Sequence, residues 1–120
     1  MLENGNLDAF NYEINAMQAD FCAAIGDVNR VRIVYALTHA PHNVKTLANI
    51  LNLSPSATSR HLRILREKGL VEANRSGHSV EYSLAAPELL DAFDILLNIL
   101  NTQLTHRASL IELERYDEEQ

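Results

Sequence analysis

The 120-residue sequence has one cysteine, Cys22, and no tryptophan. A single cysteine cannot form an intramolecular disulfide, so the composition excludes a disulfide scaffold and favours a reducing, cytoplasmic location. There is no run of some 18 apolar residues, which argues against a membrane-spanning helix. The start, MLENGNLDAF, lacks the basic residues and apolar block of a signal peptide. These absences predict a cytoplasmic protein with no membrane partner, folded as a single domain over residues 1–120.

Catalytic patterns are also missing from the sequence. It contains no recognisable nucleophile–base pair, paired carboxylates, phosphate-binding loop or metal triad. We therefore predict that the protein is not an enzyme.

What the sequence does contain is a basic region inside an acidic chain. The net charge is −6, yet residues 27–82 carry eight Lys and Arg against four Asp and Glu, which gives +4. The flanks carry −4 over residues 1–26 and −6 over residues 83–120. A local positive region of this kind is typical of a nucleic-acid footprint, although the net charge alone would argue against one.

Apolar residues recur at helical spacing in the first and last parts of the chain. They predict helices over residues 7–25 and about 88–105. The first apolar stripe consists of Leu7, Phe10, Ile14, Met17, Phe21 and Ile25. The last helix is apolar over most of its circumference, which predicts burial on more than one side. A homodimer built on the first and last helices (1–26 and 87–107) is the simplest account. Residues 108–120 are expected to form a charged tail, and its end, ELERYDEEQ at 112–120, is expected to fray.

Between these helices the pattern predicts a helix-turn-helix followed by a β-hairpin. Asp27, Asn43 and Ser54 are expected to cap helices over residues 28–39, 44–51 and 55–68. The helix-turn-helix spans 44–68, and the hairpin "wing" spans 70–84, with strands at 70–73 and 79–84 joined by a loop at 74–78. The predicted fold class is mainly α with a small β-hairpin wing, a winged helix-turn-helix.

The second helix of this motif has two distinct faces. Thr58, Leu62, Leu65 and Gly69 are expected to pack inward, and the opposite face combines short hydroxyls with arginines suited to bases and phosphates. Arg66 and Lys68, further along, are expected to meet phosphates. The predicted DNA-binding residues are Ser54, Ser56, Ser59, Arg60, Arg63, Lys45, Arg75 and His78.

Several motifs resemble those of the ArsR/SmtB family of bacterial winged-helix repressors, over roughly residues 20–100. AIGDVNRVRI at 24–33 resembles the family pattern A-L-x-D-x-x-R-x-x-I, and SRHL at 59–62 and LREKGLV at 65–71 continue the likeness. The resemblance implies a homodimeric repressor that binds an imperfectly palindromic double-stranded DNA operator and responds to an inducer. The family's base-reading positions fall on Ser56, Ser59 and Arg60, and His61 is expected to support the helix.

The sensing subclass is not identifiable from these residues. The thiolate pair and the last-helix ligand set of the metal-sensing relatives are absent here, so no cofactor is predicted. Zinc or another transition metal stays open at His39, His42 and Cys22, and at His106 with Glu112 and Glu114. A buried, inert Cys22 is the favoured alternative to a redox thiol.

A second function stays open beside DNA binding. The acidic flanks and the aliphatic last helix are also compatible with a winged-helix protein-interaction module that binds no operator.

Overall fold

The computed structural model describes the backbone of residues 4–119 and the side chains of residue 9, residues 11–115 and residue 118. The side chains of Leu7 and Phe10, the first members of the predicted apolar stripe, lie outside the described residues. The contacts divide the chain into two units, residues 1–86 and 87–120, which are described separately. The single domain expected over residues 1–120 stays a prediction.

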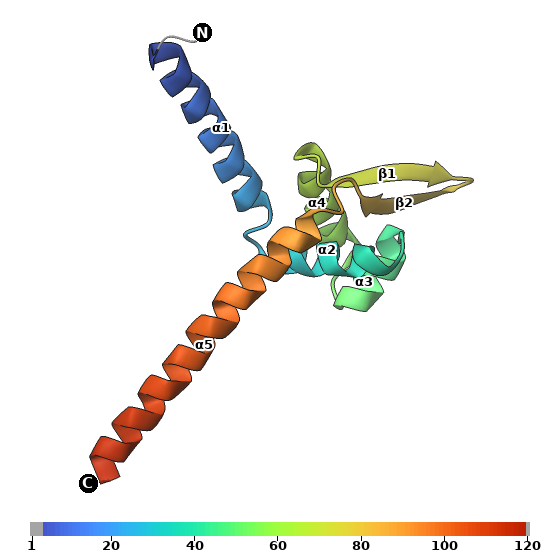
Figure 1. The fold of residues 1–120 in the computed structure, drawn as a ribbon. Helices are drawn as coiled ribbons and strands as arrows, with labels where there is room; N and C mark the ends of the chain where they lie inside the picture. The colour runs from blue at the N-terminus through green and yellow to red at the C-terminus, as the bar shows by residue number, and fades with distance from the viewer. Residues whose placement is uncertain (1–3, 120) are drawn as a thin grey trace. The chain divides into compact units, whose positions relative to one another are not determined.

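The first unit contains four helices followed by a two-stranded antiparallel hairpin (Figure 1). The helices are α1 (Asn4–Ala24), α2 (Val28–His39), α3 (Val44–Leu51) and α4 (Pro55–Glu67), and the strands are β1 (Val71–Ser76) and β2 (Ser79–Leu84). The winged helix-turn-helix predicted from the sequence is confirmed.

Side-chain caps fix where α2, α3 and α4 begin. The Asp27 carboxylate accepts hydrogen bonds from the amides of Asn29 at 2.8 Å and Arg30 at 3.2 Å. Asn43 accepts from the amide of Thr46 at 2.8 Å, and Ser54 caps α4 in the same way. Each cap satisfies an amide that the first helical turn would otherwise leave unpaired. All three caps were predicted from the sequence.

The core of the first unit lies where α2, α3 and α4 pack together. Ile33 and Val34 of α2, Leu47 of α3, and Leu62 and Leu65 of α4 are fully buried there. Burying an aliphatic side chain of this size stabilises the fold by about 1.5–3 kcal/mol. This core holds α4 by one face only.

The hairpin is tighter than the sequence suggested. Its strands pair from Val71 opposite Leu84 to Ser76 opposite Ser79, so the predicted loop at 74–78 is wrong and only two residues form the turn. Gly77 holds the first turn position with φ +64°, where a type II′ turn favours glycine. The hairpin is also tied to the loop before α3, because the backbone of His42 exchanges hydrogen bonds of 3.1 and 2.8 Å with Tyr82.

The second unit contains α5 (Leu89–Glu119), a helix of 31 residues. The expectation that residues 112–120 fray is wrong through Glu119, the end of the described backbone. Residues 88–119 contain no glycine or proline to end the helix, and Leu, Glu, Arg and Ala are strong helix formers.

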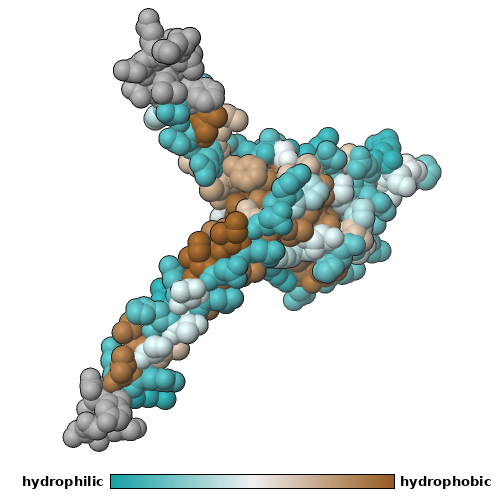
Figure 2. Space-filling view, in the orientation of Figure 1, coloured by the Kyte–Doolittle hydropathy of each residue, from teal (hydrophilic) through white to brown (hydrophobic). Residues whose placement is uncertain are grey.

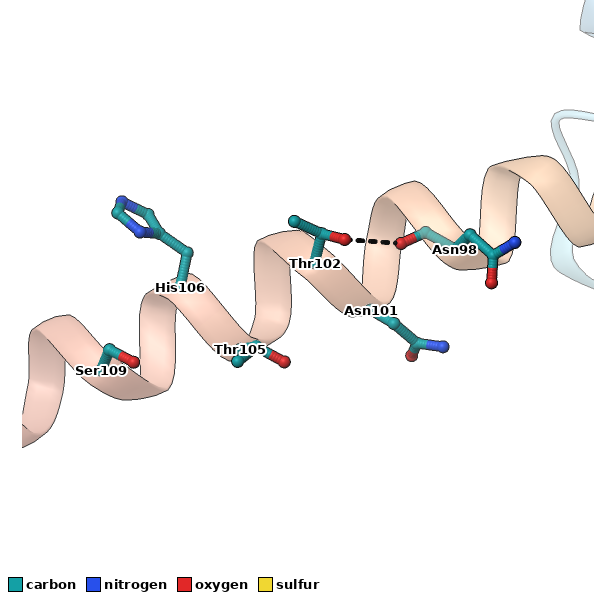
Figure 3. Close-up of a pocket in the computed structure, with 6 residues that line it drawn as sticks. All are labelled: Asn98, Asn101, Thr102, Thr105, His106 and Ser109. Carbon is teal, nitrogen blue, oxygen red and sulfur yellow. Dashed lines mark hydrogen bonds between the residues drawn. The ribbon is translucent and has the colours of Figure 1, made fainter.

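Two faces of α5 differ in character. Large apolar side chains remain about half exposed on α5, where Figure 2 shows brown patches. One face carries Leu96, Leu97, Leu100, Leu104 and Ile111, and Ile95, Ile99, Leu110 and Leu113 are exposed outside it. A polar face carries an open hollow lined by Asn98, Asn101, Thr102, Thr105, His106 and Ser109 (Figure 3). Among the helices of residues 4–119, none combines the length and apolar composition needed to cross a membrane.

The helix cap formed by Asp27 should contribute to the stability of the fold. We expect Asp27→Ala to lower the free energy of unfolding by about 1 kcal/mol, and Asp27→Asn, which keeps a capping oxygen, to lower it by much less. Urea unfolding at one fixed protein concentration measures both. Equal losses in the two variants would show that the cap is not what Asp27 contributes.

The same carboxylate makes stability depend on pH. Burial raises the pKa of Asp27, but hydrogen bonds from the amides of Arg30 and Asn29, with the neighbouring positive charges, lower it by more, so the pKa lies below its ordinary 3.8. The stabilisation from the ionised form is therefore fully present above pH 3.8 and is lost as the pH falls below that value. Asp27→Asn should show a smaller loss over the same acid range.

Candidate nucleic-acid interface

The start of α4 is exposed and its local geometry is fixed by hydroxyl groups. The Ser54 hydroxyl accepts from the amide of Ala57 at 3.1 Å and lies 3.3 Å from the hydroxyl of Ser56. Thr58 donates to the carbonyl of Ser54 at 2.9 Å. Because Pro55 occupies the first turn, its missing N–H costs nothing there. The helix therefore presents its positive end and short polar side chains on the surface.

Along α4, buried and exposed positions separate cleanly into two faces. Thr58, Leu62 and Leu65 are fully buried, as predicted from their spacing. Gly69 was expected on the same inward face, and that expectation is wrong: it lies after the helix ends, exposed, with φ +76°. The chain reverses there to enter β1, and a positive φ suits glycine.

The two arginines of the outer face have unengaged guanidinium groups. Arg60 and Arg63 are exposed, and within the described part of the chain neither side chain has a hydrogen-bond or ion-pair partner. An unpaired guanidinium offers five donors in a planar fork that matches guanine edges and phosphate oxygens.

The remaining predicted contact residues lie on the wing and on α3. Arg75 is near the end of β1, His78 is in the hairpin turn, and Lys45 is in the first turn of α3. All eight residues expected to bind DNA are exposed: Ser54, Ser56, Ser59, Arg60, Arg63, Lys45, Arg75 and His78. Their exposure permits the predicted contacts, and their individual roles stay predictions.

Lys68 is engaged differently from what the sequence suggested. A phosphate contact was expected, but its ammonium lies 2.6 Å from the carboxylate of Asp20 on α1. Both side chains are partly exposed, and an ion pair of this kind contributes at most about 1 kcal/mol. The pair joins the end of α4 to α1.

Sequence reasoning missed the partner of His61. This side chain is only 7% exposed, and its Nδ1 lies 3.4 Å from a guanidinium nitrogen of Arg30 on α2. The expected supporting role for His61 agrees with its burial. The signal for Arg30 was its place in the Asp27-x-x-Arg30 motif, which gave no indication of the long-range contact.

The residues proposed for a metal lie on separate segments. His39 ends α2 and is exposed, the backbone of His42 is paired with Tyr82, and Cys22 is on α1. The burial expected for Cys22 is wrong in the single chain, where it is exposed. Across the described residues, no three or more His, Cys, Asp or Glu side chains are grouped so that they could hold a metal ion.

With this geometry in place, comparisons with known proteins identify the family. The model of the bacterial regulatory proteins of the arsR family matches residues 27–73. The transcriptional repressor SdpR of Bacillus subtilis is 31% identical over 78 residues, covering 65% of this chain and 87% of SdpR. The chain belongs to the ArsR family. The resemblance seen in its motifs is confirmed.

Solved structures agree with this ArsR-family fold. The crystal structure of Rv0081 from Mycobacterium tuberculosis matches with a TM-score of 0.73 and 28% identity, over 79% of this chain and 96% of that one. The solution structure of a homodimeric winged helix-turn-helix DNA-binding domain, Mb0332 from Mycobacterium bovis, matches with a TM-score of 0.72. That match covers 80% of this chain and 89% of the other at 23% identity, and it supports the fold alone.

Family membership gives the exposed face of α4 its functional context. The protein is a DNA-binding transcriptional regulator of the ArsR type, and the region matched by the family model runs from the cap of α2 through the helix-turn-helix into β1. The comparisons give no support to a protein-interaction module without operator binding.

The wing turn of this ArsR-family protein can be tested directly. We expect Gly77→Ala to destabilise the fold by about 1–2 kcal/mol, because alanine resists positive φ while the space around the glycine is open. His78→Ala, at the neighbouring turn position, is the matched control and should change stability by less than about 0.5 kcal/mol. Thermal unfolding of the two variants side by side distinguishes backbone strain from loss of a surface side chain.

Proposed function

We propose that the protein is a homodimeric, cytoplasmic repressor that binds an imperfectly palindromic operator and is released from it by a signal. It acts by binding and carries out no catalysis. The observation that carries the proposal is the outer face of α4, where serine hydroxyls are exposed and the guanidinium groups of Arg60 and Arg63 have no partner among the described residues.

In this proposal α4 is the recognition helix and enters the major groove. Ser56 and Ser59 are short, so the backbone can approach the groove floor, and Arg60 donates two hydrogen bonds to a guanine edge. Arg63 meets phosphates beside the groove. The contact with DNA is expected to end before the last turn of α4, because the carboxylate of Glu67 in that turn would repel the DNA backbone.

Other exposed cations position the protein on the backbone of the duplex. Lys45 reaches phosphates from α3, and Arg75 and His78 reach the flanking backbone or minor groove from the wing. Ser54 adds its hydroxyl at the start of α4, where the helix dipole also favours a phosphate. Contacts of this kind fix the register of the protein but carry little sequence information.

The apolar face of α5 supports the homodimer. Leu97, Leu100 and Leu104 are 44%, 51% and 59% exposed in the single chain, although they follow one another along one face of the helix. A contiguous apolar stripe of this length is typical of an interface. On α1, Ile14 and Met17 are also exposed and offer a second copy apolar surface of their own. A two-fold pair would place its recognition helices about 34 Å apart, one turn of DNA.

Substitution of the proposed base-reading arginine tests operator binding. We expect Arg60→Ala to weaken binding to a wild-type-selected duplex by about 1–3 kcal/mol and to relax base preference at one position of each half-site. Titrations at one salt concentration, with the duplex selected from a random-sequence library, measure both effects.

Arg115→Ala is the control, because it removes an equal charge from α5. It should leave affinity and base preference unchanged. If the wild-type protein retards no duplex even at low salt, the protein-interaction alternative replaces this proposal. If it binds and Arg60→Ala binds equally well, another residue reads the base.

A charge placed on the apolar face of α5 tests the dimer. We expect Leu100→Glu to convert the protein to a monomer, because the carboxylate would be buried unpaired at the interface. Thr102→Glu, on the polar face, should remain dimeric. Sedimentation at several protein concentrations gives the association state, and a dimeric Leu100→Glu variant would remove α5 from the proposed interface.

A further inference from the structure

His61 belongs to the recognition helix but faces away from its DNA-binding side. Its neighbours in sequence differ sharply: Arg60 is exposed and Leu62 is fully buried. At 7% exposure, the His61 ring cannot reach a base while α4 keeps its packing on the core. Its buried polar nitrogen instead requires an internal partner.

Arg30 supplies that partner and at the same time holds the end of α1. Its Nε donates to the carbonyl of Ala24, one Nη lies 3.4 Å from the carbonyl of Ala23, and the other lies 3.4 Å from Nδ1 of His61. Ala24 is buried, and the last carbonyls of a helix have no partner within it. One planar guanidinium therefore joins the last turn of α1 to the middle of α4.

The direction of these hydrogen bonds follows from the chemistry of the groups. A guanidinium has donors and no acceptor, so in the hydrogen bond between Arg30 and His61 the guanidinium donates and Nδ1 of the ring accepts. The Asp27 carboxylate, 4.0 Å from the same Nδ1, accepts from the Arg30 amide and fixes the base of that side chain.

A second contact joins the same two helices at the C-terminal end of α4. The Lys68–Asp20 ion pair connects the C-cap of α4 to α1, about one turn before the carbonyls that Arg30 holds. Two attachments on one helix restrict its tilt as well as its distance. The partly exposed ion pair is the weaker of them, since solvent screens it.

We infer that Arg30 and His61 are positioning residues that set the angle of the recognition helix against α1 and thereby fix the half-site spacing that the dimer accepts. This inference rests on the proposed function. Spacing is sensitive to this angle, because α4 has 13 residues and is about 20 Å long, so a tilt of about 10° moves its far end by about 3.5 Å, one base-pair step.

The experiment compares spacing profiles. The probes are the palindrome that the wild-type protein selects from a random duplex library, and the same palindrome with its centre lengthened or shortened by one or two base pairs. Wild-type protein should prefer one spacing strongly. For Arg30→Met and His61→Leu we expect affinity for the best spacing to fall about tenfold, equivalent to about 1.4 kcal/mol, while affinity for neighbouring spacings changes little.

Two further variants separate positioning from general stability. His61→Asn places an oxygen at the same distance from Cα as Nδ1, so it should restore the sharp spacing profile. Arg32→Met, on the same helix, removes a side chain that bonds to Asn29 at 3.1 Å and should leave the profile unchanged. A merely structural role would lower thermal stability without altering the relative affinities for the different spacings.

The outcomes are distinguishable. If the wild-type protein enriches no palindrome, the proposed function fails and this inference fails with it. If it does, an unchanged profile in Arg30→Met and His61→Leu overturns the inference alone. A double-mutant cycle on thermal stability gives an independent check that needs no DNA. The double variant should lose no more than either single variant, and additive losses would overturn the link between the two residues.

If Arg30→Met or His61→Leu does not fold, Arg30→Lys can be used in the same experiment. It keeps the charge but cannot reach three acceptors in one plane, so we expect it to broaden the profile. A profile as sharp as that of the wild type would overturn the inference.

Discussion

The interface depends on one constraint, that α4 must be held firmly by one face so that the other can remain free. Thr58, Leu62 and Leu65 satisfy it with side chains that are completely buried. The hydroxyl of Thr58 does not oppose this burial, because it is hydrogen-bonded to the carbonyl of Ser54. Packing and capping involve the inner face and the first turn, and the outer arginines Arg60 and Arg63 have no partner among the residues that the structure describes. A helix supported in this way can meet a charged ligand without rearranging its own core.

Much of this arrangement could be predicted because it is local. The caps at Asp27, Asn43 and Ser54 each involve an amide two or three residues away, so a few neighbouring residues determine where three helices begin. The two faces of α4 follow from helical spacing, and the exposure of Arg60 follows from the same count. The order of these elements, with a glycine turn in the hairpin, was enough to predict the winged helix-turn-helix and the surface on which the candidate contacts lie.

What could not be predicted depends on partners far away in sequence or on the absence of a stop signal. The contact between Arg30 and His61, and that between Lys68 and Asp20, join residues that no local pattern links. Lys68 was therefore predicted to contact a phosphate, because nothing in the neighbouring sequence indicates that its partner is Asp20 on α1. Residues 112–120 were expected to fray because they are highly charged, but charge does not end a helix that lacks glycine and proline.

The uncovered apolar face of α5 has a further consequence, for how the protein responds to its own abundance. In the proposed dimer, leucines that are half exposed in a single chain would become buried when two copies meet, so the stability contributed by that face would grow with protein concentration. At low expression a larger share of chains would be single, each presenting only one recognition helix. The fraction of two-fold DNA sites that are occupied would then rise more steeply than in proportion to the amount of protein. A modest change in synthesis of the protein would therefore change DNA occupancy without any small molecule.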